Sequence, residues 1–208
     1  MMDNHSIQAV IWDMGGVLVR TEDYHPRETL AAQFGMTRLE LEDLVFTGES
    51  ADLASVGKIS YRDHFAQIGR ALRLSPPALE AFERAFWAGD RMDWELISFI
   101  KNLRPDWKTG LLSNAWSETR NMVERAFSFA FDHVFDTTVF SADVGMMKPQ
   151  SEIYRLVLER LNCPPEHAVF IDDMPGNIEG ARAVGLKGIR FTTHEQTISD
   201  LRAMLANE

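Results

Sequence analysis

The sequence predicts an α/β protein, a doubly wound, Rossmann-like parallel sheet that carries an inserted helical cap. From Met92 onward, short apolar stretches alternate with segments of helical periodicity, whereas residues 22–90 show helical periodicity without a convincing strand. The length of 208 residues exceeds the ~100–150 residues usual for one domain and falls short of two domains. We therefore expect an α/β core formed by residues 1–20 and 91–208, and a helical cap formed by residues 21–90.

The first strand and the cap helices are indicated by an apolar run and by helix start and stop signals. Residues 9–12 form an apolar strand that ends at Asp13 and leads into a glycine turn. The signals in the insertion are Pro26 at the start and Phe34 with Gly35 at the end of one helix, Thr37 as the cap of the next, and Ser60 and Ser75 before two more. Apolar positions at helical spacing predict that these helices share a core of their own.

The second half of the chain predicts the rest of the sheet and the helices that cover it. The expected strands are residues 110–112, 134–139, 168–171 and 188–191. The expected helices are residues 96–103, 118–127, 152–161, a segment that starts at Pro175 and stops at Gly185, and residues 199–205. In such sheets the ligand site lies beyond the carboxyl ends of the strands. Polar side chains at those ends are therefore the first candidates for function.

Charge and cysteine content exclude several classes of protein. The 21 basic and 31 acidic residues give a net charge of −10, which argues against a nucleic-acid or anionic-membrane surface. The single cysteine, Cys163, excludes an internal disulfide and suits a reducing compartment. Residues 1–8 lack the basic and apolar parts of a secretory signal, and no segment reaches the ~18 apolar residues of a membrane span. We expect a soluble, cytoplasmic protein, monomer or homodimer.

Polar residues follow four of the predicted strands or lie in the loops beyond them. They are Asp13, Ser113, Lys148 and the adjacent pair Asp172 and Asp173. Carboxylates gathered in one crevice repel one another unless a cation neutralises them, and a site of this kind suits Mg²⁺ with a substrate phosphate. A lysine charge and a serine hydroxyl can then hold the phosphoryl oxygens. The pattern predicts a magnesium-dependent site for a small phosphorylated molecule.

Four segments resemble the motifs of the haloacid dehalogenase-like (HAD) hydrolase superfamily and occur in that family's order. They are Val10–Val17 (VIWDMGGV), Leu111–Asn114 (LLSN), Gly145–Pro149 (GMMKP) and Phe170–Asn177 (FIDDMPGN). Each segment is weak evidence by itself, and the four together are strong. The resemblance covers nearly the whole chain outside the helical insertion.

The resemblance implies a role for each site residue. Asp13 is the nucleophile that forms an aspartyl-phosphate, and Ser113 and Lys148 bind the phosphoryl group. The implied metal ligands are Asp13, the backbone carbonyl of Gly15, Asp172 and Asp173, with Asn177 supporting the metal loop. The implied phosphate frame is Gly15, Gly16, Ser113, Asn114 and Lys148. The implied cofactor is Mg²⁺, and the implied substrate is a small phosphomonoester, with sugar phosphates as one candidate.

Gly15 departs from the family pattern, since its phosphatases usually place an aspartate there to protonate the leaving oxygen and activate water. Such acid-base help contributes about 10²–10⁴ in rate. Three readings stay open: a phosphatase for substrates with an easier leaving group, a dehalogenase-type enzyme that acts on carbon, or an inactive binding relative. A phosphonatase needs a cap amine, and Lys58 is the only lysine in residues 21–90. The paired acids Asp172 and Asp173 favour a retained metal.

Polar residues of the insertion form a second set of candidates. Arg20, Asp23, His25 and His64 have the chemistry to reach a substrate, and for each we expect a solvated surface position instead. His25 lies soon after the first strand and is a candidate for the missing proton donor. The tryptophans are expected to serve packing, with Trp116 the least certain because it lies next to Ser113 and Asn114.

Overall fold

A computed structural model describes residues 6–104 and 106–206 of the chain. It contains a five-stranded sheet in the order β5-β4-β1-β6-β7, in which every neighbouring pair is parallel. The strands are β1 (Ala9–Trp12), β4 (Lys108–Ser113), β5 (Thr137–Phe140), β6 (Ala168–Asp172) and β7 (Lys187–Arg190). β1 lies at the centre between β4 and β6. The predicted fold class, a doubly wound parallel sheet, is confirmed.

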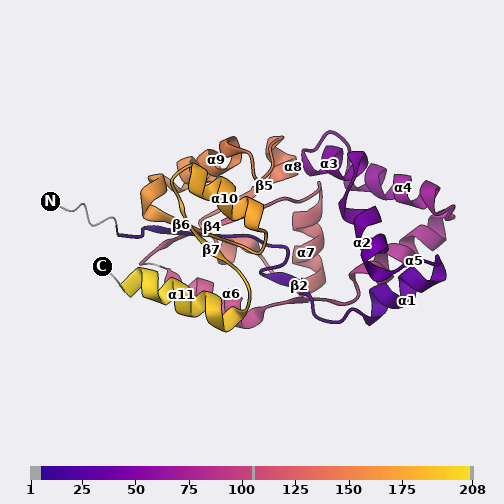
Figure 1. Ribbon diagram of the computed structural model, residues 1–208, viewed down its shortest axis with the longest axis horizontal. Coiled ribbons are helices and arrows are strands. Elements are labelled where there is room, and N and C mark those ends of the chain that lie inside the picture. Colours follow the sequence, from indigo (N-terminus) through magenta and orange to yellow (C-terminus); the bar gives the residue numbers. More distant parts are fainter. Residues whose placement is uncertain (1–5, 105, 207–208) are drawn as a thin grey trace.

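Both faces of the sheet are covered by helices, as the near-continuous apolar strands require. The covering helices are α6 (Trp94–Leu103), α7 (Thr119–Phe127), α8 (Ser141–Val144), α9 (Ser151–Leu161), α10 (Pro175–Ala183) and α11 (His194–Ala206). Val10 and Trp12 of β1 belong to the apolar core beneath α6 and α11, whereas Ala9 and Ile11 belong to the core beneath α9 and α10. Figure 1 shows these two helix layers on opposite sides of the strands. The period-2 alternation of β1 thus supplies both cores.

Some expected boundaries of the core were wrong by a few residues. The strand expected at 134–139 begins only at Thr137, after a 3₁₀ turn at Phe131–His133. Residues before Thr137 are joined to β4 through Thr109, whose Oγ1 donates to the Val134 carbonyl at 2.9 Å and whose carbonyl accepts the Asp136 N–H at 2.8 Å. The helix expected at 199–205 begins earlier, at His194, because polar residues in its first turns hide its apolar period.

The chain between β1 and α6 forms five helices that pack around a separate apolar core. The helices are α1 (His25–Gln33), α2 (Arg38–Phe46), α3 (Glu49–Ser55), α4 (Tyr61–Ala71) and α5 (Pro76–Trp87). Thr37 and Ser60 each form a capping box, and Ser75 precedes α5, as their sequence positions predicted. α3 and the short antiparallel ribbon of β2 (Val19–Thr21) with β3 (Asp90–Met92) were not predicted.

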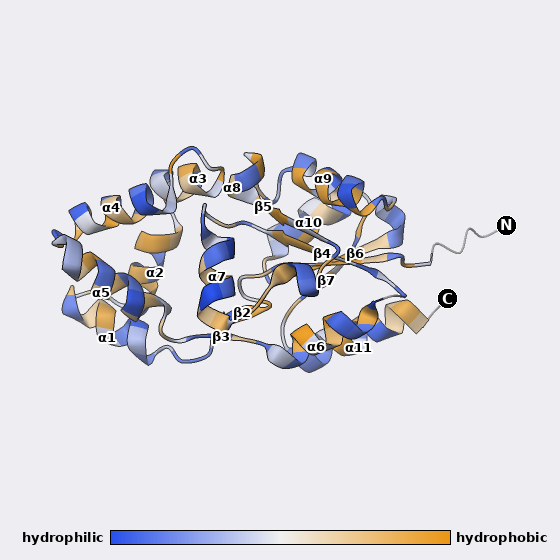
Figure 2. Ribbon diagram, turned by 180° about the vertical axis from the view of Figure 1, so that it is seen from behind, coloured by the Kyte–Doolittle hydropathy of each residue, from blue (hydrophilic) through white to orange (hydrophobic). Residues whose placement is uncertain are grey.

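This helical insertion lies at one end of the molecule, next to the carboxyl ends of the sheet strands (Figure 1). The ribbon of β2 and β3 carries both connections between the insertion and the core. Figure 2 shows apolar residues on the strands and on the inward sides of the helices, and hydrophilic residues on their outer sides. Within the described part of the chain, no helix has the length and apolar character needed to cross a membrane.

Candidate active site

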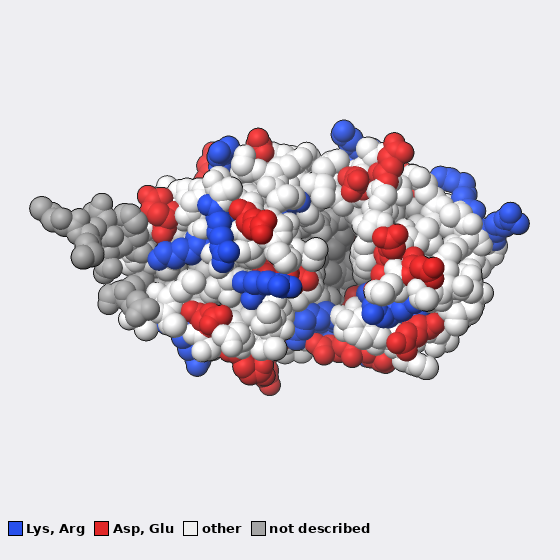
Figure 3. All heavy atoms as spheres, in the orientation of Figure 1, with Lys and Arg blue, Asp and Glu red and all other residues white. Residues whose placement is uncertain are grey.

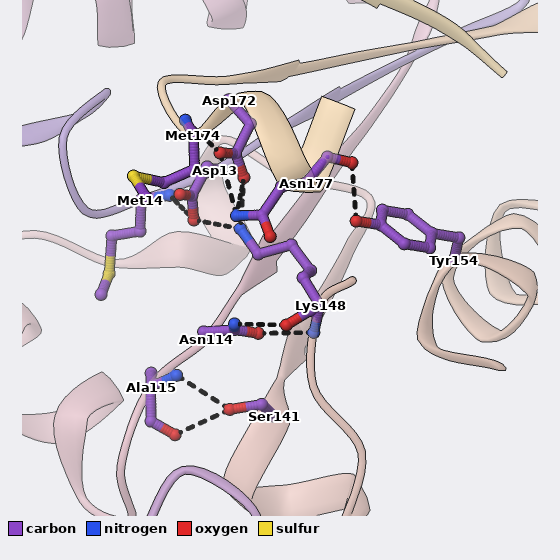
Figure 4. A network of polar contacts seen from close by, with 10 residues as sticks. All are labelled: Asp13, Met14, Asn114, Ala115, Ser141, Lys148, Tyr154, Asp172, Met174 and Asn177. Carbon is purple, nitrogen blue, oxygen red and sulfur yellow. Dashed lines mark hydrogen bonds and ion pairs between the residues drawn. The ribbon is translucent and has the colours of Figure 1, made fainter. Parts of the chain in front are cut away.

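Asp13 lies at the centre of the sheet's carboxyl edge, directly after β1, and pairs with a buried lysine. Lys148 Nζ lies 2.8 Å from Asp13 Oδ1 and 2.6 Å from Asp172 Oδ2, so one ammonium group joins the carboxylates that follow β1 and β6. Asp13 is 6% exposed, Lys148 1% and Asp172 0%. Figure 4 shows the three side chains converging from separate segments of the chain. Buried ion pairs of this kind are strong only when further hydrogen bonds satisfy the remaining atoms.

Those further bonds are present around Asp172. The Asn177 side-chain amide donates to both carboxylate oxygens of Asp172 at 3.0 Å, and the Met174 backbone N–H donates to Oδ1 at 2.8 Å. Tyr154 in turn donates its hydroxyl to the Asn177 carbonyl at 2.7 Å. Asp172 is therefore fixed by the first turn of α10. Its observed bonds orient Lys148 towards Asp13.

Asp173 completes a group of three carboxylates. One oxygen from each of Asp13, Asp172 and Asp173 lies within 4.8 Å of the others. Asp173 reaches this position because Gly16, at φ +76°, has no side chain: a Cβ there would lie 2.5 Å from Asp173 Oδ2. The donor set consists of oxygens only, which suits Mg²⁺ better than Zn²⁺. Three acids against one ammonium leave the local charge negative, so a divalent cation fits this group.

Burial and mutual repulsion perturb two of these acids. Burial raises the pKa of the Asp13 carboxyl to about 7, against the opposing effect of Lys148. Burial, followed by the neighbouring charge of Asp172, also raises the pKa of Asp173. Both carboxylates are costly to keep ionised without a cation beside them. A bound cation would remove that cost by supplying an opposite charge.

The loop after β4 is attached to the Lys148 loop by a reciprocal pair of bonds. The Asn114 side-chain amide donates to the Lys148 carbonyl at 2.9 Å, and the Lys148 N–H donates to Asn114 Oδ1 at 2.8 Å. Ser113, the last residue of β4, is buried beside them. Ser141 closes the arrangement, since its hydroxyl accepts from the Ala115 N–H and donates to the Ala115 carbonyl. The residues predicted at the ends of β1, β4 and β6 therefore lie at one edge of the sheet, and Lys148, from the loop between α8 and α9, joins the acids after β1 and β6.

The turn at Gly15 and Gly16 has two different halves. Gly16 is held by a hydrogen bond from its N–H to the Val19 carbonyl at 2.9 Å. Because it has no Cβ, it leaves the space that Asp173 occupies. Gly15 is exposed, and a Cβ added to it would meet no atom within 4 Å. The turn thus has room for a side chain at residue 15.

The polar candidates in the insertion have other partners. Arg20 donates to the Val17 carbonyl and to Asp93. His25 is exposed at the start of α1, and its ring lies 3.4 Å from the hydroxyl of Thr29, which is also exposed. The expected surface position of His64 was wrong, because its ring is fully buried and lies 2.9 Å from the Val45 carbonyl. Bonding partners many residues away in the chain allow this burial, and local sequence gives no signal of them. Lys58 is exposed on the turn between α3 and α4.

Comparison with known proteins matches this geometry to a family. A model of haloacid dehalogenase-like hydrolases matches residues 7–185. The chain belongs to this family. This HAD hydrolase is 29% identical over 216 residues to a phosphorylated carbohydrates phosphatase of Thermotoga maritima, which covers 96% of this chain and 90% of that protein. It is 27% identical over 207 residues to the sesquiterpene phosphatase astK of Aspergillus oryzae, covering 96% and 97%.

Solved structures show the same fold. A predicted HAD-like hydrolase of Porphyromonas gingivalis superposes with a TM-score of 0.78 at 22% identity, covering 96% of this chain and 98% of that chain. A HAD enzyme of Bacteroides thetaiotaomicron in complex with magnesium and inorganic phosphate gives a TM-score of 0.76 at 20% identity, covering 91% and 96%. The predicted membership of the HAD superfamily is confirmed, and so is the expectation of a probable phosphatase.

Two supporting residues of this HAD hydrolase were missed from sequence. Ser141 directly follows β5, so a strand-end polar residue was available as a signal. Tyr154 lies on the buried face of α9 among apolar residues, and its hydroxyl bond to the Asn177 carbonyl depends on the position of α10. Side chains that support the site residues from behind carry little local sequence signal.

Proposed function

We propose that the protein is a magnesium-dependent hydrolase of small phosphomonoesters that works through an aspartyl-phosphate on Asp13. The observation that carries the proposal is the grouping of Asp13, Asp172 and Asp173 oxygens within 4.8 Å of one another, with Lys148 on Asp13. A carboxylate beside both a cation site and an ammonium group is placed to attack phosphorus. The phosphatase relatives support the same reaction class.

In this proposal each residue has a distinct task. Asp13 attacks phosphorus, the ester P–O bond breaks, and the leaving oxygen takes a proton from water to become the alcohol. Lys148 balances the charge of the phosphoryl oxygens and Ser113 donates a hydrogen bond to one of them, beside the turn at Gly15 and Gly16. Asn114 acts through its two bonds to Lys148, which fix the lysine loop. Water then cleaves the aspartyl-phosphate and releases inorganic phosphate.

The metal would be held by Asp13, Asp172 and Asp173, with the Gly15 carbonyl. Bound there, Mg²⁺ would neutralise charge on the nucleophile and on the phosphoryl group. The observed bonds of Asp172 to Lys148, Asn177 and Met174 suggest that this acid acts chiefly as an anchor. Asp173, half-buried and positioned by the gap at Gly16, is the more available ligand.

The helical insertion serves as the cap in this proposal, with the division at residues 20–21 and 90–91. Its separate core and its two connections through the β2–β3 ribbon support this division. A cap over the strand ends limits access by bulky polymers, which favours small metabolites over phosphoproteins. The lone, buried Cys163 fits a reducing compartment such as the cytoplasm.

Two other reaction classes of the family have less support. A carbon–halogen hydrolase has no need for acids gathered beside its nucleophile, and here three acids meet. A phosphonatase mechanism needs a lysine amine in the site, whereas Lys58 lies exposed on a turn of the insertion. An inactive binding role would rest on Gly15 alone.

The test is a screen of phosphomonoesters, including an aryl phosphate and sugar phosphates, with Mg²⁺ and with EDTA. We expect phosphate release with Mg²⁺, none with EDTA, and none from Asp13→Asn under either condition. Turnover retained by Asp13→Asn would exclude the covalent mechanism. Metal-independent halide release from 2-haloacids would replace the proposal with the dehalogenase reading, and ligand binding without any turnover would favour a binding protein.

A further inference from the structure

An aromatic side chain links the phosphate-binding loop to the cap. Trp116 follows Ser113 by three residues, so its Cα lies within about 11 Å of the Ser113 Cα. Although it belongs to the core, its ring packs into the insertion, stacked on Phe46 with ring centroids 5.9 Å apart and 4.7 Å from His64. The neighbouring Ser117 hydroxyl accepts the Tyr61 N–H at 3.0 Å. Trp116 and Phe46 thus meet where the cap and the catalytic loop touch.

Phe46 has one face in this cluster and another in solvent. Its ring is 45% exposed, at the end of α2. Figures 1 and 2 both place α2 on the side of the insertion that faces the core. Beside Phe46, α2 lines a hollow of about 540 Å³. Exposed aromatic surface costs free energy in water. The exposed part of Phe46 is therefore a place where an apolar group of a ligand would be stabilised.

A second apolar side chain marks the other wall of the site. Met174, which directly follows Asp173, is 56% exposed. Figure 4 shows Met174 close to Asp13 and Asp172. Methionine adapts its shape to varied apolar groups, which suits a flexible organic chain. Apolar surface therefore lies on both the core and the cap sides of the catalytic group.

The charges near this surface are acidic or already paired. The hollow beside Phe46 includes Glu40, Glu42 and Asp43 in its lining. The nearby cations Arg27 and Arg38 are both bonded to Glu42. Figure 3 shows a hollow between core and insertion with largely uncharged walls and charged groups at its rim. The residues that line the hollow beside Phe46 thus include three acids and no cation.

We propose that the site is specific for monophosphates of apolar alcohols, aryl or long-chain alkyl, whose organic part lies against Phe46 and Trp116 while the phosphate lies at Asp13. This inference rests on the proposed function and narrows its substrate class. It assigns Phe46 as a specificity-determining residue.

The wild-type test is a chain-length series of ethyl, butyl and hexyl phosphate with Mg²⁺, compared with glucose 6-phosphate. All four release primary alcohols, so differences report binding of the organic part more than leaving-group chemistry. Full burial of a methylene group strengthens binding about four-fold, so a half-covered chain gains about two-fold per methylene. We expect kcat/KM to rise about ten-fold or more from ethyl to hexyl phosphate, mainly through KM, and to be lowest for glucose 6-phosphate.

The variant test is Phe46→Ser, with Phe46→Leu as the conservative change. Phe46→Ser should flatten the dependence of kcat/KM on chain length, and Phe46→Leu should restore most of that dependence. The matched control is Trp94→Ser, since Trp94 is also an exposed aromatic residue but packs against Phe129. The control should keep the wild-type dependence. A flat wild-type series, a preference for the sugar phosphate, or equal loss for ethyl and hexyl phosphate in Phe46→Ser would overturn the inference.

Binding of alkylphosphonates separates this inference from the proposed function, because their C–P bond resists hydrolysis. Affinity in the presence of Mg²⁺, measured by calorimetry, should rise from ethyl- to hexylphosphonate and lose this rise in Phe46→Ser. If affinity rises but no phosphate ester is hydrolysed, the specificity holds and the proposed hydrolysis fails. If esters are hydrolysed and affinity is independent of chain length, the hydrolysis holds and the specificity fails.

Discussion

The carboxylate of Asp173 occupies the space that a side chain at residue 16 would fill. A Cβ at Gly16 would lie 2.5 Å from Asp173 Oδ2 and 2.6 Å from its Cγ, and the positive φ of +76° adds strain for any other residue. The close approach links the turn after β1 to the acidic pair after β6. It explains why a glycine is needed at this position of the turn.

Gly16→Ala is therefore expected to displace Asp173 and weaken the cation site. We predict a loss of Mg²⁺ affinity of about ten-fold or more, since an altered ligand position commonly costs 10–100-fold. Calorimetric titration with MgCl₂ measures it. The control is Gly176→Ala, three residues after Asp173, where an added Cβ meets nothing within 4 Å. Equal Mg²⁺ affinity in Gly16→Ala and wild type would show that Asp173 is not a ligand.

Gly15→Asp is expected to add the acid-base group that the turn lacks. A side chain fits there without a clash, because no atom lies within 4 Å of the added Cβ. We predict that hydrolysis of alkyl phosphates rises at least about ten-fold, a part of the 10²–10⁴ that a general acid contributes. An aryl phosphate with a good leaving group should gain less. Gly15→Asn, similar in size but unable to transfer the proton, is the control, and identical rates for the two variants would contradict the prediction.

Lys148→Met is expected to remove the charge that joins Asp13 and Asp172. Breaking a buried ion pair from one side costs about 3–5 kcal/mol of unfolding free energy. We predict a loss of that order without Mg²⁺, measured by urea denaturation, and a fall in turnover of about 100-fold or more. Lys101→Met, an exposed lysine on α6, is the control and should resemble the wild type. Wild-type turnover in Lys148→Met would remove the lysine from the mechanism.

His64 is expected to make the insertion sensitive to acid. Burial lowers the pKa of the His64 ring below its ordinary 6.5, against the opposing bond to the Val45 carbonyl. The unfolded chain thus binds the proton more readily than the folded chain, so stability is full above about pH 6.5 and falls below it. Thermal unfolding should show a larger fall between pH 7.5 and pH 5 in the wild type than in His64→Gln. Equal falls would show that His64 does not contribute.

Most of the candidate site residues could be predicted because the fold brings them together by a simple rule. Asp13, Ser113 and Asp172 each end a strand or directly follow one, and parallel strands bring those ends to one edge of the sheet. Lys148 lies in a loop after α8 where no periodicity marks it, and it was a candidate because its charge suits a phosphoryl group beyond the strand ends. The order and type of most helices also followed from their caps and apolar periods.

Other features depend on contacts between distant segments. The β2–β3 ribbon has three-residue strands of mixed polarity, Val19-Arg20-Thr21 and Asp90-Arg91-Met92, so it shows no alternation long enough to predict. The burial of His64 requires Val45 and Ser50 to approach from two other helices. The insertion of Trp116 into the cap likewise depends on how α2 and α4 are arranged.

The most direct test of the central claim is chemical trapping of the intermediate on Asp13. During turnover of an aryl phosphate with Mg²⁺, borohydride reduces an aspartyl-phosphate to homoserine, which peptide mass spectrometry locates in the sequence. We predict homoserine at residue 13 in the wild type, dependent on both substrate and Mg²⁺. Turnover that proceeds with Asp13 unmodified, or homoserine at another aspartate, would contradict the assignment of Asp13 as the nucleophile.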